Sequence, residues 1–147
     1  MLEVHFHNRV NDNCLKFAVI IAKYKDKWVF CKHKERKTYE CPGGHRELGE
    51  NILETAKREL FEETGAIAYS IELIGGYSVY DGESETFGML FYAEIHEFGN
   101  LPNLEIERIE LFDDLPKHWT YPQIQPILLE HVMKSRVGGE KVSSYDI

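Results

Sequence analysis

Apolar and β-branched residues gather in short runs along the chain, and polar segments containing glycine or proline separate them. The run 15–24, LKFAVIIAKY, is apolar at most positions and predicts a buried strand. The run 28–33, WVFCKH, follows the polar turn KDK, so the two runs predict a β-hairpin. Further runs at 71–80, 85–98 and 107–114 predict three more strands.

Two other segments have the features of helices. Asn51 is expected to cap the first, because Glu54 follows three residues later as in a capping box. Gly65 is expected to end it in a left-handed conformation, which gives a helix over 52–64. The segment PQIQPILLEHVMKSRV predicts a second helix over 122–137, with Pro122 near its start. Because Pro126 lies in the first turn or just beyond, we expect the start nearer Ile124.

Strands and helices mixed in this order indicate an α/β or α+β domain, in which helices cover a mixed β-sheet. A chain of 147 residues is long enough for one domain with an adequate core. We expect that domain over residues 1–137, and a flexible tail, GGEKVSSYDI, over 138–147.

Charge and composition narrow the class of protein. No apolar run approaches the roughly 18 residues of a membrane span, and the N-terminus lacks the pattern of a signal peptide. We therefore expect a cytoplasmic protein whose three cysteines are free thiols. A net charge of −8 argues against a general nucleic-acid-binding surface, but it permits a phosphorylated small molecule if a cation mediates the contact.

Three carboxylates crowd the end of the first predicted helix, within RELFEETG at 58–65. Glu59, Glu62 and Glu63 have the spacing i, i+3 and i+4, which places them on one stripe of the helix. Three oxygen donors on one rigid face indicate a site for a hard divalent cation, Mg²⁺ or Mn²⁺. Spacing alone leaves open the alternative of a solvated acidic face.

The longer segment GHRELGENILETAKRELFEETGA, residues 44–66, resembles the Nudix box. In that pattern a glycine is followed at fixed spacings by Glu, Arg-Glu, a bulky apolar residue, Glu-Glu, a second glycine and an apolar residue. The matching positions are Gly44, Glu50, Arg58, Glu59, Leu60, Glu62, Glu63 and Gly65. Ala66 is smaller than the usual last residue, and Cys41 replaces the more common aromatic or aliphatic residue before the Pro-Gly-Gly lead-in.

The resemblance implies an α/β/α sandwich with a mixed β-sheet between helices. It also implies an enzyme in which water attacks a phosphorus of a diphosphate linkage with the help of a divalent cation. Glu62 and Glu63 would be the main metal ligands, and Glu59 a further ligand or the general base. The carbonyl of Gly43 would join the metal shell.

Other positions of the box are expected to orient these ligands. Glu50 and Arg58 would form a hydrogen-bonded pair that holds the loop against the helix. Gly44 and Gly65 are the two glycines of the pattern and are expected to shape the box at its ends.

Many Nudix enzymes take one more carboxylate from a loop outside the box. The candidates near FGNLPNLEIER are Glu97, Glu105 and Glu107, of which we favour Glu105 as a catalytic residue. A solvated loop acid is an equal alternative for each of them.

The basic stretch KHKERK precedes the box. Lys32, Lys34 and Arg36 are expected to bind a terminal phosphate, with a solvated turn as the alternative. The wider segment KHKERKTYECPGG resembles the corresponding region of MutT-type nucleoside triphosphate pyrophosphohydrolases. Trp119 and Tyr121 lie before the second helix, where this family often contacts the base, and are expected to bind substrate.

A zinc site is a rival interpretation of the same region. Its ligands would be Cys31, His33, Cys41 and His45, whose spacing fits no standard zinc pattern well.

These features favour Mg²⁺-dependent hydrolysis of a nucleoside triphosphate to a monophosphate and pyrophosphate, with 8-oxo-dGTP as one substrate by analogy. Hydrolysis of ADP-ribose or another nucleoside diphosphate derivative is the second interpretation. The third is a Nudix-fold module that binds nucleotides without hydrolysing them, and the intact acidic triad of the box weighs against it. The expected partner is a small-molecule nucleotide, without nucleic acid or membrane, and the chain is expected to be a monomer or homodimer.

Overall fold

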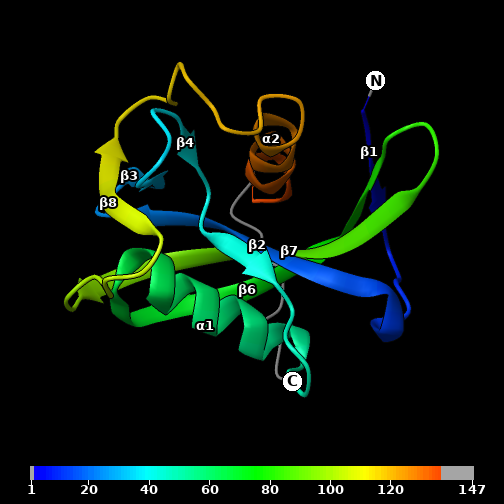
Figure 1. Cartoon of the computed structure of the whole chain (residues 1–147), viewed down its shortest axis with the longest axis horizontal. Helices are drawn as coiled ribbons and strands as arrows, with labels where there is room; N and C mark the ends of the chain where they lie inside the picture. The colour runs from blue at the N-terminus through cyan, green and yellow to red at the C-terminus, as the bar shows by residue number, and fades with distance from the viewer. Residues whose placement is uncertain (1, 137–147) are drawn as a thin grey trace.

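The computed structural model describes residues 2–136, which form a mixed β-sheet and two α-helices (Figure 1). The strands are β1 (Glu3–His7), β2 (Leu15–Tyr24), β3 (Lys27–His33), β4 (Tyr39–Glu40), β5 (Gly43–His45), β6 (Ala66–Tyr80), β7 (Glu85–Phe98) and β8 (Ile106–Phe112). The helices are α1 (Ile52–Thr64) and α2 (Gln125–Ser135), and a 3₁₀ turn spans Asp12–Cys14. Neither α-helix within these residues is long and apolar enough to cross a membrane.

The strands of the sheet run in both directions. The main path is β1-β6-β7-β2-β3-β4, with β5 paired to β2 and β8 paired to β3. The β6–β7 pair is a long antiparallel hairpin, whereas β7 pairs β2 in parallel, with Ile20 opposite Phe91. Because β2 pairs with β7, β3 and β5, it lies inside the sheet, which explains why nearly all of its sequence is apolar.

Side chains alternate along β2 and divide the core between the two faces of the sheet. Ala18, Ile20 and Ala22 pack in one cluster with the apolar face of α1. Val19 and Ile21 point the other way and pack in a second cluster with α2. In Figure 1 the two helices accordingly lie on opposite sides of the sheet, which confirms the expected α/β/α sandwich.

Several predicted elements are confirmed. The first helix spans 52–64 as expected, and the first two strands form an antiparallel hairpin. The second helix begins at Gln125, next to the expected start near Ile124, and Pro126 stands in its first turn, where a missing N–H costs nothing. Its predicted end at 137 and the predicted tail over 138–147 lie outside the described residues.

Other boundaries were wrong. The loop expected before the first helix contains β4 and β5, whose two and three residues are too few to show any alternation. These strands form because β3 and β2 offer them pairing edges. β6 begins at Ala66, well before the predicted start at 71, because it pairs with the far end of β7, where Ala66 faces Phe98.

Candidate active site

Helix α1 is fixed at both ends by its own sequence. The side chain of Asn51 accepts the N–H of Glu54 at 2.8 Å, and the Glu54 carboxylate accepts the N–H of Asn51 at 2.9 Å. Gly65 closes the other end with a φ of 78°, a left-handed conformation that glycine adopts without cost. The apolar stripe of α1 packs on the sheet, so the orientation of its acidic stripe is set as well.

Arg58 joins the loop of the box to the helix. Its Nε donates to Oε2 of Glu50 at 2.6 Å, and its Nη2 donates to Oε1 of the same carboxylate at 3.1 Å. Nη2 also donates to the carbonyl of His45 at 2.9 Å. Nη1 donates to Glu59 at 3.0 Å and to Glu62 at 3.3 Å. The Arg58 hydrogen bonds hold the pKa of Glu50 down at about 2.

Glu59 and Glu63 occupy a different environment. Burial, aided by the charges of nearby acids and opposed by Arg58, raises the pKa of Glu59 to about 7. Burial likewise raises the pKa of Glu63 to about 8, although its carboxylate accepts the N–H of Gly43 at 3.0 Å. We call Glu59, Glu62 and Glu63 of α1 the acidic cluster. Gly44 makes room for it, because a Cβ at that position would overlap the Glu59 carboxylate. The fold therefore holds these acids close together, with Arg58 as the basic side chain that bonds to Glu59 and Glu62.

This donor set fits a hard divalent cation by its chemistry. Carboxylate and carbonyl oxygens are the ligands that such cations prefer, and a cation would favour the charged forms that burial disfavours. Within residues 2–136, no three His, Cys, Asp or Glu side chains converge as a metal site. Glu62 bonds to Arg58, and Glu63 bonds to the N–H of Gly43. To hold a cation, Glu62 would have to release Arg58, and Glu63 would have to release the N–H of Gly43.

The three candidate acids outside the box differ in their surroundings. After the larger effect of burial, the charge of Glu105 contributes to the raised pKa of both Glu59 and Glu63. Glu105 therefore acts on these acids through its charge, while its own side chain is 80% exposed and lies 3.3 Å from Nε2 of His33. Glu107 is instead bound by two basic side chains, and Glu97 lies in the β6–β7 ladder.

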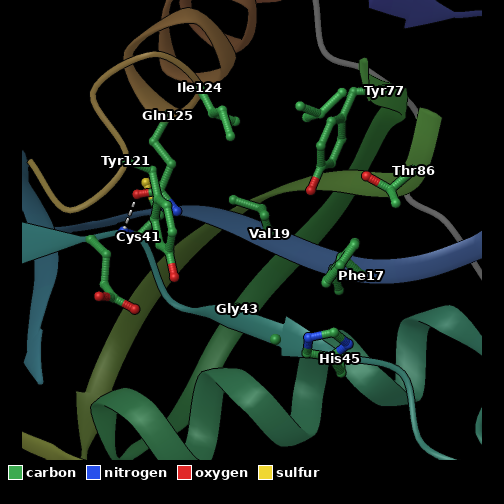
Figure 2. Close-up of a pocket in the computed structure, with 14 residues that line it drawn as sticks. Phe17, Val19, Cys41, Gly43, His45, Tyr77, Thr86, Tyr121, Ile124 and Gln125 are labelled. Atoms are coloured by element: carbon green, nitrogen blue, oxygen red, sulfur yellow. Dashed lines mark hydrogen bonds between the residues drawn. The ribbon is translucent and has the colours of Figure 1, made fainter. Parts of the chain in front are cut away.

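A pocket of about 270 Å³ lies across β5 from α1 (Figure 2). Its walls come from β2, β4, β5, β6, β7, the segment that leads into α2 and the first residue of α2, and they are mostly apolar. Gly43 and Gly44 connect the pocket to the acidic cluster, because both line the pocket while they contact Glu63 and Glu59. A ligand in this pocket would therefore lie one short strand away from the carboxylates.

Comparison with known proteins agrees with this geometry. The model of the NUDIX domain family matches residues 14–131. The chain belongs to the Nudix family. It is 30% identical to a Bacillus subtilis (strain 168) protein named "Putative 8-oxo-dGTP diphosphatase YtkD" over 118 residues, which are 80% of this chain and 74% of the relative.

Two further proteins similar to this chain are named as pyrophosphohydrolases. A Lactococcus lactis subsp. cremoris (strain MG1363) protein named "Probable DHNTP pyrophosphohydrolase" is 38% identical over 60 residues, 41% of this chain and 36% of that protein. The solved structure of the Bacillus subtilis pyrophosphohydrolase BsRppH matches with a TM-score of 0.76 and 26% identity, covering 91% of this chain and 90% of that one. This chain is accordingly a Nudix pyrophosphohydrolase, of a family that acts on small-molecule nucleotides and generally needs a divalent metal.

The basic residues expected to bind phosphate in this Nudix hydrolase each have a partner. Lys32 donates to Glu107 of β8 at 2.8 Å, and Lys34 donates to Asn103 at 2.6 Å. Arg36 donates to Glu40 at 3.0 Å. Since Glu40 lines the pocket, Arg36 is the member of this set that lies beside it.

The two aromatic residues expected to bind substrate lie in different places. Trp119 packs edge-on against Phe30, with 5.2 Å between ring centroids and 84° between ring planes, and it does not line the pocket. Tyr121 lines the pocket and is 40% exposed. The structure thus brings Tyr121, and not Trp119, to the Nudix pocket.

The residues of the rival zinc site do not share a centre. Cys31 and Cys41 are buried, and burial raises the pKa of both thiols, which favours the thiol over the zinc-binding thiolate. His33 faces the carboxylate of Glu105 at 3.3 Å, and His45 packs on an aromatic ring of β2. The structure gives the zinc interpretation no support.

Sequence reasoning missed two polar residues of the pocket, Glu40 and Gln125. Glu40 is 8% exposed and belongs to β4, where the sequence predicted a loop. Gln125 is 6% exposed and shares the buried stripe of α2 with Leu128, Leu129 and Val132. A glutamine on an otherwise apolar helix stripe was the signal available in the sequence.

Proposed function

We propose that this Nudix hydrolase cleaves nucleoside triphosphates to a nucleoside monophosphate and pyrophosphate, with Mg²⁺ or Mn²⁺ as its metal. The observation that carries the proposal is the arrangement across β5. Gly43 and Gly44 contact the acidic cluster of α1 and also line a mostly apolar pocket. A nucleotide whose base enters the pocket would have its phosphates near the carboxylates.

The acidic cluster supplies the groups for a phosphoryl reaction. Glu59, Glu62, Glu63 and the carbonyl of Gly43 would hold the cation. When bound, that cation would supply neutralisation of phosphate oxygens and activation of water. Glu105, which lies close enough to affect the acids of the box, would accept a proton from the attacking water or orient it.

The pocket supplies the groups for the rest of the substrate. Tyr121 offers a half-exposed ring to a base. Arg36 lies at the pocket through its bond to Glu40 and is the cation best placed for a substrate phosphate. The name of the Bacillus subtilis relative supports an oxidised guanine nucleotide among the substrates.

The test is a hydrolysis screen of the full chain with Mg²⁺ and with Mn²⁺, with products resolved by anion exchange. The panel contains the four dNTPs, 8-oxo-dGTP, ADP-ribose, dinucleoside polyphosphates and nucleotide sugars. Pyrophosphate and a monophosphate from one or more triphosphates are the expected products. AMP and ribose phosphate from ADP-ribose, with all triphosphates intact, would overturn the proposal in favour of a nucleoside diphosphate hydrolase.

A further inference from the structure

Two polar groups that line the pocket make no hydrogen bond to the described residues. They are the amide nitrogen of Gln125 and the hydroxyl of Tyr77, whose residues are 6% and 4% exposed. Because every buried side-chain nitrogen and oxygen of the described residues has a partner, these two groups remain accessible to water from the pocket. A ligand that displaces this water must replace its hydrogen bonds, so the two groups are placed to select among ligands.

The orientation of the Gln125 side chain is fixed by the backbone. The N–H of Cys41 donates to Oε1 of Gln125 at 2.8 Å, which is the dashed bond in Figure 2. A backbone N–H needs an acceptor, so the oxygen of the carboxamide must face Cys41. The amide NH₂ is then directed away from Cys41, and Gln125 lines the pocket as a hydrogen-bond donor.

Tyr77 contributes the second unpaired group. Figure 2 shows its hydroxyl end turned into the pocket beside Val19, with which it shares the lining. Its ring packs closely over Gly88, where a Cβ would come within 2.7 Å of the ring and of the hydroxyl oxygen. Burial raises the pKa of the Tyr77 hydroxyl, so the group keeps its proton and can donate as well as accept.

We propose that Gln125 is a specificity-determining residue, whose amide NH₂ donates to a ring carbonyl and so selects nucleotides with a keto base. The inference rests on the proposed function, because it takes the pocket as the place where the base binds. Guanine and hypoxanthine carry a carbonyl oxygen where adenine carries an amino group, and uracil and cytosine differ in the same way. The Tyr77 hydroxyl bonds a second polar atom of the same ring.

In this pocket the amino group of an amino base would face the NH₂ of Gln125, and both groups are hydrogen-bond donors. The NH₂ of Gln125 and the amino group of the base would both be buried without an acceptor, so such nucleotides would be disfavoured about tenfold to a hundredfold. Keto and amino nucleotides share their sugar and phosphates. Gln125 would therefore change the preference between substrates without changing the chemical step.

The experiment compares kcat/KM for dITP with that for dATP, and for dUTP with that for dCTP, because each pair differs in the keto and amino groups. Wild type should prefer the keto member of each pair. Gln125→Glu keeps an oxygen for the Cys41 N–H and replaces the donor with an acceptor. The keto-to-amino ratio should fall at least about tenfold in that variant.

The matched control is Gln123→Glu, the same chemical change at an exposed position two residues earlier. It should leave the ratio, kcat and Tm at wild-type values. A wild type that treats both members of each pair alike would overturn the inference. So would a folded Gln125→Glu variant whose ratio equals that of wild type.

A binding measurement separates this inference from the proposed function. If no triphosphate is hydrolysed, calorimetric titration with dIMP and dAMP gives the same comparison without turnover, and equal affinities would overturn the inference. Tyr77→Phe gives a second route should Gln125→Glu fail to fold. The lost hydroxyl has no hydrogen-bond partner within residues 2–136, so Tm should hold while KM, or Kd, for the keto nucleotide rises about tenfold. An unchanged constant would remove Tyr77 and its pocket from base recognition.

Discussion

The guanidinium of Arg58 donates two hydrogen bonds, 2.6 and 3.1 Å long, to the carboxylate of Glu50. The same group also bonds to Glu59 and Glu62, so one cation joins the loop of the box to the acidic face of α1. Arginine suits this position because its planar fork can bind several carboxylate oxygens at once. This relationship predicts that Arg58 positions the acids of the box and that its loss destabilises the fold.

Replacing Arg58 with alanine should lower both stability and activity. The variant leaves Glu50 and its acidic neighbours without their shared counter-charge, which should cost about 3 kcal/mol of the free energy of unfolding. Urea denaturation and Tm measure that loss, and kcat measures the misplacement of the acids. Lys57→Ala is the control, because it removes one positive charge from the exposed side of the same helix. Wild-type Tm in Arg58→Ala would contradict the orienting role.

Replacing Glu62 with glutamine should reduce turnover about a hundredfold or more while the fold persists. The amide keeps the shape of the side chain but cannot offer a charged oxygen to a divalent cation. Steady-state kinetics with saturating Mg²⁺ and a circular dichroism melt are the two measurements. Glu83→Gln in the exposed β6–β7 turn is the control for the loss of one negative charge. A fully active Glu62→Gln enzyme would show that Glu62 is not a metal ligand.

The stability of the metal-free protein should depend on pH in a definite direction. The folded-state pKa values of Glu59 and Glu63, about 7 and about 8, lie above the ordinary value of 4.5. From pH 4.5 to about pH 8 the folded chain therefore binds more protons than the unfolded chain, and stability falls as pH rises. In EDTA, Tm should decrease across this window, and Mg²⁺ should restore it most at the upper end.

The control for this pH effect is a variant with glutamine at both positions. Its amides do not titrate, so the part of the Tm decline that comes from the two acids should disappear, together with the stabilisation by Mg²⁺. A wild-type Tm profile that matches the profile of the variant, with and without the cation, would show that neither acid is perturbed by burial.

The acidic part of the site was predictable because its signals are local. Asn51, Glu54 and Gly65 determine where the first helix begins and ends, so the spacing of the three acids could be converted directly into a helix face. Separate apolar runs and helix signals predicted helices that cover a mixed sheet, and the α/β/α sandwich followed from the resemblance of residues 44–66 to the Nudix box.

The pocket was not predictable, because its residues meet only through strand pairing. Cys41 reaches Gln125 across 84 positions of sequence, and Tyr77 comes from a third element. Trp119 illustrates the same limit. Its place two residues before Tyr121 suggested a shared role, yet Tyr39 pairs with the backbone at Trp119 and the indole packs on Phe30.

Of the three acids outside the box, Glu105 alone should matter for turnover. Its charge reaches the acids of α1, whereas Glu107 is neutralised by basic neighbours. Glu105→Gln should lower kcat about tenfold or more, with little change in Tm. Glu107→Gln and Glu97→Gln are matched controls that remove the same charge nearby. An equal loss of kcat in one control would assign the role to that acid as well. An equal loss in both controls would show that the effect is not specific to Glu105.

Trp119→Ala and Tyr121→Ala should have opposite effects on Tm and KM. The Trp119 ring packs against Phe30 in the core beside α2, so its removal should cost about 3 kcal/mol of stability and leave KM nearly unchanged. The Tyr121 ring lines the pocket with much of its surface exposed, so its removal should raise KM for the best nucleotide about tenfold with little loss of Tm. Tyr121→Phe, which keeps the ring, should restore most of the affinity if the ring faces a base. A raised KM with wild-type Tm in Trp119→Ala would show that Trp119, and not Tyr121, contacts the substrate.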